Sequence, residues 1–189
     1  MNEQKVTPKR ALISVSDKTS LIPFAQRLNE LGVEIISTGG TLNALQKANI
    51  PVKHVSEITD FPEVMDGRVK TLHPLLLGGI LGLRDTHKTQ AEQHNIHWID
   101  LVVCNLYPFA SVIKKENVEF SDAVENIDVG GPTMLRAAAK NFPWVGVVTA
   151  VKHYDEVIQQ IESGGLDFDF RKTLAAAAFS HTAHYDSVI

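Results

Sequence analysis

Short apolar runs alternate with longer amphipathic stretches along this chain. Residues 10–16 form the first run, and a short apolar segment of this kind predicts a buried strand. Apolar side chains then recur at helical spacing from Leu21 to Leu31, and Gly32 marks the end of the predicted helix. Further strands are predicted at residues 33–37, 51–55, 100–106 and 144–149. Further helices are predicted at residues 42–48, 121–126, 132–141, 151–163 and 168–187.

Strands that alternate with helices are typical of βαβ units, which form a parallel sheet with helices on both faces. The expected fold class is therefore α/β. No internal repeat or low-complexity linker divides the sequence, so we expect one domain over residues 10–189 after a flexible N-terminus, residues 1–9. Residues 56–82 have the least regular pattern, which favours a long functional loop.

The composition is that of an ordinary globular domain, since 44% of the 189 residues are hydrophobic and 21% are charged. No apolar run reaches the about 18 residues of a membrane-spanning helix, and the N-terminus lacks the apolar core of a signal peptide. A single cysteine, Cys104, excludes an intramolecular disulfide and favours a reducing cytoplasm. The net charge of −4 disfavours a general nucleic-acid binder, so an anionic ligand would need a local positive field.

The C-terminal segment, residues 171–189, is rich in alanine and strongly helix-forming. It reaches the last residue without a Gly, Asn or Pro that would end the helix. Two interpretations remain open: the natural chain continues beyond Ile189, or the protein ends in a simple exposed helix.

The first strand ends in a segment suited to binding a phosphate. Residues 14–20 (SVSDKTS) lead into the first predicted helix, whose N-terminus carries free N–H groups and a partial positive charge. Lys18 adds a full charge there. An ordinary helix cap by Ser16, Asp17 or Thr19 is the simpler interpretation of this segment alone.

The second strand ends in residues 37–41 (STGGT), which repeat this arrangement. Gly39 and Gly40 let a ligand approach the backbone closely, while Thr38 and Thr41 offer hydroxyl donors. A Gly-Gly turn that merely connects two elements is the alternative. Two strand ends with the same chemistry favour an anion site.

Two further segments add charged and hydroxyl groups. Residues 68–74 (RVKTLHP) place Arg68 and Lys70 beside an apolar run, where cations need an anionic partner. A solvated charged face is the alternative. Residues 105–109 (NLYPF) end a predicted strand, and Tyr107 would lie at the sheet edge where open α/β folds bind ligands, although an isolated tyrosine is more often a core residue.

Residues 127–131 (IDVGG) precede a helix in which we expect Pro132 to be the first residue. Asp128 therefore either caps this helix or faces a ligand. The same helix carries Lys140 directly after three alanines. Small neighbours allow such a lysine to be drawn inward, toward a role in proton transfer.

The histidine pairs give little support for a metal site. His94 and His97, like His181 and His184, are three residues apart, but no Cys, Glu or third His aligns with either pair. Cys104 lies in an apolar run, so we interpret it as a core residue rather than a nucleophile. The sequence contains no dinucleotide-binding, Walker or nucleophile-elbow motif.

Six segments together resemble one known family. In order, they are SVSDKT (14–19), STGGT (37–41), GRVKTLHP (67–74), CNLYPF (104–109), IDVGGP (127–132) and LRAAAKN (135–141). This set is similar to the IMP cyclohydrolase domain, the N-terminal half of the bifunctional AICAR formyltransferase/IMP cyclohydrolase of purine biosynthesis. The first two segments are shared with the wider methylglyoxal-synthase-like fold, and the later four are specific in combination.

The resemblance implies a three-layer methylglyoxal-synthase-like α/β domain around a mostly parallel sheet. It implies dehydrative ring closure of 5-formamidoimidazole-4-carboxamide ribotide to inosine monophosphate, without a cofactor or a metal. It implies a proton-handling group of Lys70, Tyr107, Asp128 and Lys140. It also implies substrate contacts from Ser16, Asp17, Lys18, Thr38, Gly39, Gly40, Thr41, Arg68, Val69, Thr71, Cys104, Asn105, Val129 and Gly130.

Two other functions remain as alternatives. A methylglyoxal-synthase-type lyase would share the fold and the TGGT turn, but we would not expect it to carry the segments at 104–109 and 135–141. A non-catalytic nucleotide-sensing domain would keep the phosphate site, but it has no need for Lys70, Tyr107 and Lys140 together.

The expected partner is a small purine nucleotide, and neither a nucleic acid nor a membrane is expected. A homodimer is compatible with the sequence, which does not determine the oligomeric state. The resemblance also implies a cytoplasmic location and a formyltransferase half that this chain lacks.

Overall fold

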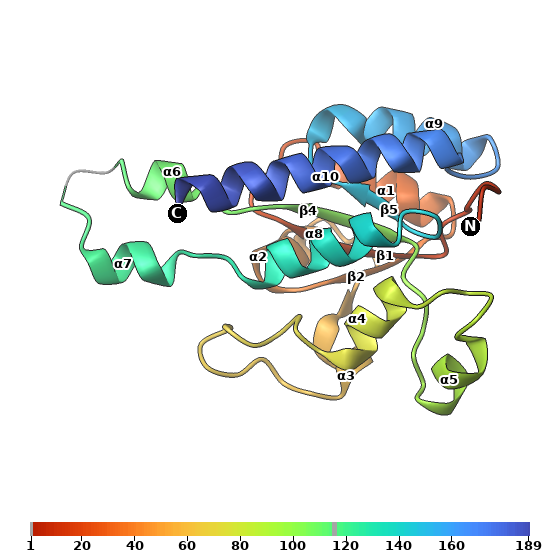
Figure 1. The fold of residues 1–189 in the computed structure, drawn as a ribbon, viewed down its shortest axis with the longest axis horizontal. Helices are drawn as coiled ribbons and strands as arrows, with labels where there is room; N and C mark the ends of the chain where they lie inside the picture. The colour runs from red at the N-terminus through yellow and green to blue at the C-terminus, as the bar shows by residue number, and fades with distance from the viewer. Residues whose placement is uncertain (1, 115–116) are drawn as a thin grey trace.

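Five short parallel strands form the central sheet of the computed structural model, which describes residues 2–114 and 117–189. Their order across the sheet is β3-β2-β1-β4-β5 (Figure 1). The strands are β1 (Arg10–Val15), β2 (Glu34–Ser37), β3 (Lys53–His54), β4 (Leu101–Asn105) and β5 (Gly146–Val148). The central strands β1 and β4 are buried along most of their length, as expected for strands covered on both faces.

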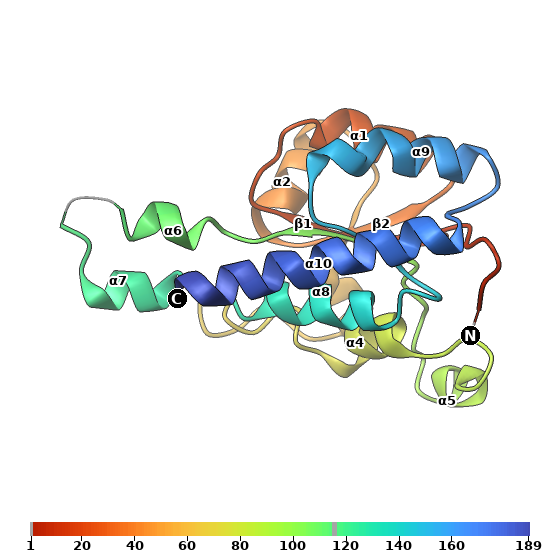
Figure 2. The ribbon, with the colours of Figure 1, turned by 45° about the horizontal axis from the view of Figure 1, so that its top comes forward.

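Two layers of helices cover the sheet (Figure 2). One layer contains α1 (Leu21–Glu30), α2 (Gly39–Lys47) and α9 (Tyr154–Glu162). The other contains α4 (Pro74–Leu81), α8 (Gly130–Lys140) and α10 (Phe168–Val188). The shorter helices are α3 (Val55–Thr59), α5 (Lys88–Gln93), α6 (Phe109–Val112), α7 (Phe120–Glu125) and the 3-10 helix η1 (Val151–His153). The predicted three-layer α/β fold is confirmed.

Side-chain size and burial explain the packing of the two layers. The apolar side chains Leu21, Phe24 and Leu28 of α1, which were predicted to lie on one face, are buried. Phe24 stacks on Tyr154 of α9 with 4.0 Å between the ring centroids. In α8 the alanines at 137–139 are all buried. Their small side chains let α8 lie close to β4 and α10.

All five predicted strands are present, but the predicted loop at residues 56–82 is wrong in part. It contains most of α3 and all of α4. The sequence LLLGGIL of α4 is apolar on nearly every side, so it lacks the amphipathic period that identifies a helix. The irregular segment is only residues 60–73. No helix within the described ranges is both long and apolar enough to cross a membrane.

Two helices begin earlier than predicted. α2 begins at Gly39, so both glycines of the STGGT segment belong to its first turn. α8 begins at Gly130, which makes Pro132 its third residue rather than its first. A proline in the first turn costs no hydrogen bond, because the N–H that it lacks has no helical partner there.

The N-terminal segment is bound to the domain, contrary to the expected flexible N-terminus. Val6 pairs with Leu166 through backbone hydrogen bonds of 3.0 and 2.8 Å. The side chain of Asn2 donates to the carbonyl of Pro143 at 3.2 Å. The guanidinium of Arg171 in turn donates to the carbonyl of Gln4. Sequence pattern could not reveal these contacts, because their partners lie more than a hundred residues away.

The helices α6 and α7 form an arm that projects beyond the sheet (Figure 1). α7 has no buried residue, and the side chain of Phe120 is 85% exposed. A helix of six residues is not stable by itself in water. Within the described chain, α7 therefore has little apolar support, whereas α6 buries Phe109 and Val112.

Arg171 organises the junction between α10 and the loops around it. The side chain is fully buried, and it donates to five carbonyls. These belong to Asn2 at 3.5 Å, Gln4 at 2.9 Å, Phe142 at 2.9 Å, Pro143 at 3.1 Å and Leu166. Burial lowers the pKa of the guanidinium. Its hydrogen bonds make this buried cation tolerable.

We predict that Arg171→Leu lowers the free energy of unfolding by about 3 kcal/mol or more, because each buried carbonyl that loses its donor costs about 1–3 kcal/mol. Urea denaturation followed by circular dichroism measures this change. Lys172→Leu, at an exposed position one residue away, is the matched control and should stay within about 0.5 kcal/mol. Equal stability of the Arg171 variant and the wild type would contradict the prediction.

Candidate functional site

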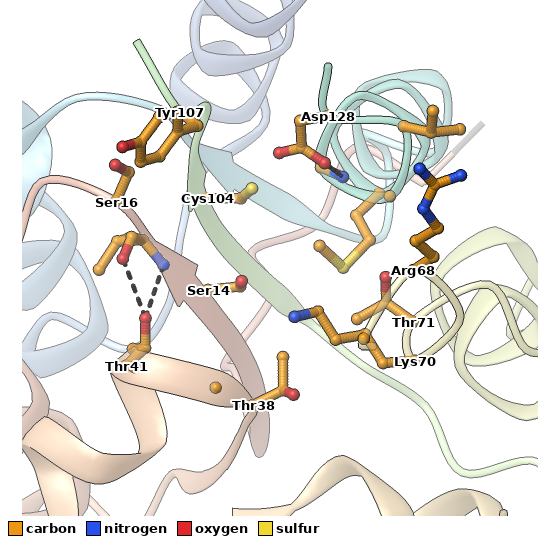
Figure 3. Close-up of a pocket in the computed structure, with 18 of the residues that line it drawn as sticks. Ser14, Ser16, Thr38, Thr41, Arg68, Lys70, Thr71, Cys104, Tyr107 and Asp128 are labelled. Atoms are coloured by element: carbon orange, nitrogen blue, oxygen red, sulfur yellow. Dashed lines mark hydrogen bonds between the residues drawn. The ribbon is translucent and has the colours of Figure 1, made fainter. Parts of the chain in front are cut away.

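A cavity of about 730 Å³ lies at the carboxyl edge of the sheet (Figure 3). Its walls come from five segments that are far apart in the sequence. They are the end of β1, the start of α2, residues 66–72, the end of β4 and residues 124–131. The motifs identified in the sequence therefore meet in one place, as expected for ligand sites at the strand ends of open α/β sheets.

The start of α2 has the features of an anion-binding site. Its first residues, Gly39 and Gly40, present N–H groups that have no helical partner. A Cβ atom placed on Gly40 would lie 3.7 Å from Nζ of Lys18, and one on Gly39 would lie 3.8 Å from Nζ of Lys70. Two ammonium groups and a helix N-terminus thus converge on this point, which we call the cradle. Figure 3 shows Lys70 pointing into the cavity.

The threonine hydroxyls of the cradle are engaged within the protein, although we had expected them to be ligand donors. Thr38 donates its hydroxyl hydrogen to Glu63. Thr41 donates to the carbonyl of Val15 at 3.0 Å and accepts from the N–H of Val15 at 2.9 Å (Figure 3). The donors that face an anion are the backbone N–H groups of α2, the two lysines, and the hydroxyls of Ser14 and Ser16, which also line the cavity.

The first strand does not lead directly into a helix N-terminus, contrary to the expectation for residues 14–20. α1 begins only at Leu21. The intervening loop is held by Asn105, whose Oδ1 accepts from the N–H of Ser16 at 2.7 Å and of Asp17 at 2.9 Å. Asn105 also donates to the carbonyl of Asp17 at 3.2 Å. This loop, rather than a helix end, brings Lys18 to the cradle.

Asp128 lies on the opposite wall, at the start of α8. Its Oδ1 accepts from the N–H of Gly131 at 2.8 Å, and its own N–H donates to the hydroxyl of Tyr185 in α10 at 2.7 Å. A Cβ atom on residue 131 would lie 2.4 Å from Oδ2 of Asp128, so only glycine fits there. Burial raises the pKa of Tyr185. It also raises the pKa of Cys104, with a smaller contribution from the charge of Asp128, so this thiol stays protonated.

Arg68 and Thr71 lie at the mouth and wall of the cavity. Arg68 forms an ion pair with Glu125 of α7, in which Nε donates to Oε1 at 3.2 Å. The hydrogen bonds that Arg68 donates to Glu125 raise the pKa of Arg68 and lower that of the glutamate. Thr71 is buried against the start of α8, where a Cβ atom on Gly130 would lie 2.7 Å from its hydroxyl oxygen.

Most of the predicted site residues line this cavity. They are Ser16, Lys18, Thr38, Gly39, Gly40, Thr41, Arg68, Lys70, Thr71, Cys104, Asn105, Tyr107, Asp128, Val129 and Gly130. Asp17 lines an adjoining hollow of about 430 Å³ instead. Val69 pairs with Val64 through backbone hydrogen bonds.

Lys140 is the main departure from the prediction. We expected it to lie within reach of Asp128, Tyr107 and Lys70. It is the last residue of α8 and is exposed, whereas the cavity lies at the first residue, Gly130. Ten steps of about 1.5 Å separate the two ends of the helix by about 15 Å. The prediction that Lys140 lies near Asp128, Tyr107 and Lys70 of the same chain is therefore wrong.

Comparison with known families identifies the domain. The family model of the MGS-like domain matches residues 20–133, and that of the AICARFT/IMPCHase bienzyme matches residues 138–189. The chain belongs to the MGS-like domain family. The resemblance recognised in the sequence is thereby confirmed.

Several proteins are similar to this MGS-like domain over nearly its whole length. The bifunctional purine biosynthesis protein PurH of Listeria monocytogenes is 55% identical over 184 residues, which are 96% of this chain and 36% of that protein. PurH of Bartonella bacilliformis is 55% identical over 185 residues, 96% and 34% of the two chains. The crystal structure of ForH matches with a TM-score of 0.84 at 34% identity and covers 96% of both chains. This chain spans about a third of the length of these curated PurH relatives.

Three residues at the site were not found from the sequence. Glu63 and Glu125 read as ordinary surface acids, and Tyr185 as part of an alanine-rich helix. Their partners, Thr38, Arg68 and Asp128, are distant in the sequence, so no local pattern signals them. Residues 2–114 and 117–189 contain no group of three or more His, Cys, Asp or Glu side chains placed to hold a metal ion.

We predict that Lys18→Ala weakens the binding of inosine monophosphate about tenfold, since a hydrogen bond to a charged group is worth about 1.5–3 kcal/mol. Isothermal titration calorimetry measures the affinity. Lys47→Ala, at the other end of α2, is the control and should bind like the wild type. Inosine, which lacks the phosphate, should bind all three proteins equally. An equal loss for nucleotide and nucleoside would remove Lys18 from the cradle.

Proposed function

We propose that this MGS-like domain is an IMP cyclohydrolase, which closes the ring of 5-formamidoimidazole-4-carboxamide ribotide to form inosine monophosphate. The observation that carries this proposal is one cavity with a phosphate cradle on one wall and Asp128 and Tyr107 on others. The match to the AICARFT/IMPCHase bienzyme family and to PurH supports it. Ring closure is an intramolecular acid–base reaction that involves no change of oxidation state.

The proposed reaction requires orientation of the substrate and proton transfers in each of two steps, addition and loss of water. The carboxamide nitrogen attacks the formyl carbon and loses a proton, and the formyl oxygen gains one to give a carbinolamine. In the second step the carbinolamine hydroxyl accepts a proton and leaves as water. The former formamido nitrogen loses its proton at the same time, which forms the C=N bond of the new ring. Asp128 is the proposed proton acceptor, and Lys70 and Tyr107 are the proposed donors. A cradle that anchors the phosphate supplies binding energy for the reactive rotamer, and the charged groups stabilise the developing oxyanion.

The alternatives receive less support. A methylglyoxal-synthase-type lyase also belongs to this fold family, but the matched relatives are described as purine biosynthesis proteins. A nucleotide-sensing domain needs the cradle alone, whereas Tyr107 and Asp128 line the same cavity here. We therefore prefer the cyclohydrolase.

We also propose that the domain works in the cytoplasm as a homodimer. The exposed apolar side chains around the arm support the second statement. They belong to Ile113, Phe120, Val124 and Val129, which are between 43% and 85% exposed. A second copy that covers this surface would remove it from water.

We predict ring closure by the isolated domain at an undiminished rate in the presence of EDTA, with no folate, nicotinamide or metal added. The substrate is mixed with the protein, and the change in ultraviolet absorbance is followed. Asp128→Asn should lower kcat about 10²–10⁴-fold, the usual contribution of a general acid or base. An activity that disappears with EDTA and returns with zinc would contradict the proposed mechanism.

Lys140 retains its implied role if it acts in the cavity of the second copy. Lys140→Ala and Lys70→Ala should then each be inactive alone. A mixture of the two should recover about a quarter of the wild-type activity, because about half of the dimers would be mixed and each would have one intact site. Mass photometry measures the dimer fraction. A mixture that stays inactive would exclude this role for Lys140.

A further inference from the structure

Glu63 connects two strand ends behind the wall of the cradle. Its Oε1 accepts the hydroxyl hydrogen of Thr38 and lies 3.4 Å from Nε2 of His54. Ser37 and His54 are register partners in the parallel strands β2 and β3. Thr38 and His54 therefore present their side chains at the same edge of the sheet, and Glu63 binds to both.

The hydrogen bonds of His54 show which of its nitrogens faces Glu63 as a donor. Nδ1 accepts from the backbone N–H of Ser56 at 3.1 Å and lies 2.5 Å from the Ser56 hydroxyl. An accepting Nδ1 leaves the ring hydrogen on Nε2, the atom nearest to Glu63. The carboxylate of Glu63 thus accepts from Thr38 at one strand end and lies 3.4 Å from Nε2 of His54 at the other.

Glu63 also directly precedes residues 64–70, which carry the cations Arg68 and Lys70. Val64 and Val69 form a backbone bridge, with N–H to carbonyl distances of 3.2 and 3.4 Å in the two directions. Glu63 and Lys70 flank this bridge and consequently lie side by side. A Cβ atom placed on Gly67 would lie 3.8 Å from Oε2 of Glu63 and 3.5 Å from Nζ of Lys70. Contacts that fix Glu63 therefore also fix the backbone of Lys70, whose side chain extends to the cradle.

We propose that Glu63 is a positioning residue for the phosphate site. Its carboxylate accepts from Thr38 and contacts the ring of His54, and it thereby docks residues 64–70 against the start of α2. Lys70 then meets the N–H groups of Gly39 and Gly40. This inference rests on the proposed function only in assuming that the ligand carries a phosphate.

The charge of Glu63 and its hydrogen bonds have opposite consequences for an anion. A carboxylate beside the cradle repels a phosphate, so its charge alone weakens binding. Its role as an acceptor aligns the lysine and strengthens binding. The two effects can be separated, because Glu63→Gln removes the charge and keeps a carbonyl oxygen that accepts from Thr38. Glu63→Ala removes both.

Calorimetric titration with inosine monophosphate and with inosine tests the proposal. The Glu63→Gln variant should bind the nucleotide at least as tightly as the wild type, whereas Glu63→Ala should bind it about tenfold more weakly. Inosine should bind all variants within about twofold, because the defect is confined to the phosphate site. Asp60→Asn is the matched control, since it removes a charge three residues away and asparagine tolerates the left-handed backbone at φ 51°.

Three results would overturn the proposal. Equal weakening by Glu63→Gln and Glu63→Ala would show that a retained acceptor oxygen does not preserve binding, which refutes the role of the hydrogen bond. Equal tightening by both would make Glu63 only a repulsive neighbour. A loss for inosine as large as that for the nucleotide would indicate a general folding role.

A second variant keeps the test decisive if Glu63→Ala folds poorly. Thr38→Val breaks the same hydrogen bond from the other side and should also weaken nucleotide binding. The effects of the two substitutions should not add, because both remove one interaction. Nucleotide binding without ring closure would refute the cyclohydrolase and leave the role of Glu63 intact. A wild-type protein that binds neither nucleotide nor inorganic phosphate would refute the cradle and this inference with it.

Discussion

Parallel pairing of β1 with both β2 and β4 places the functional groups of this domain at one edge of the sheet. Parallel strands all end at the same side, so Val15, Ser37 and Asn105 lie together although ninety residues separate the first and last. α2 begins directly after β2, so its free N–H groups face the cavity. The pairing of Val15 with Asn105 also puts the amide of Asn105 beside the β1–α1 loop, which it binds.

The local charge of this edge differs from that of the whole chain. The net charge is −4, yet Lys18 and Lys70 converge on the start of α2. Glu63 accepts from Thr38 and Glu125 pairs with Arg68, and within residues 2–114 and 117–189 neither acid forms an ion pair with the two lysines. Because the hydroxyls of Thr38 and Thr41 serve the fold, recognition of an anion depends mainly on backbone N–H groups and ammonium groups. Such donors suit a tetrahedral oxyanion of any sugar phosphate, so specificity must come from the opposite wall.

That opposite wall is built by α8 and α10. The hydroxyl of Tyr185 accepts from the backbone of Asp128, and the N–H of Gly131 holds the carboxylate. The carboxylate therefore has a defined orientation toward the cavity. α10 packs along α8 through the small side chains of α8. The C-terminal helix thereby supports Asp128, although α10 itself does not line the cavity. The buried thiol of Cys104 lies on the floor between the two walls and contributes packing.

The sequence by itself determined the α/β class, the strands and most members of the cavity, because hydrophobic period and glycine placement are local properties that survive in a linear pattern. Only the tertiary structure decided which polar groups are available to a ligand. Thr38 and Thr41 find their partners in Glu63 and Val15, about 25 residues away, and such hydrogen bonds exist only once the chain is folded. The position of Lys140 was decided in the same way. Lys140 lies in the LRAAAKN segment that pointed to the site, but it ends the helix α8. The rise of this helix separates Lys140 from the cavity, which lies at Gly130, the first residue of α8.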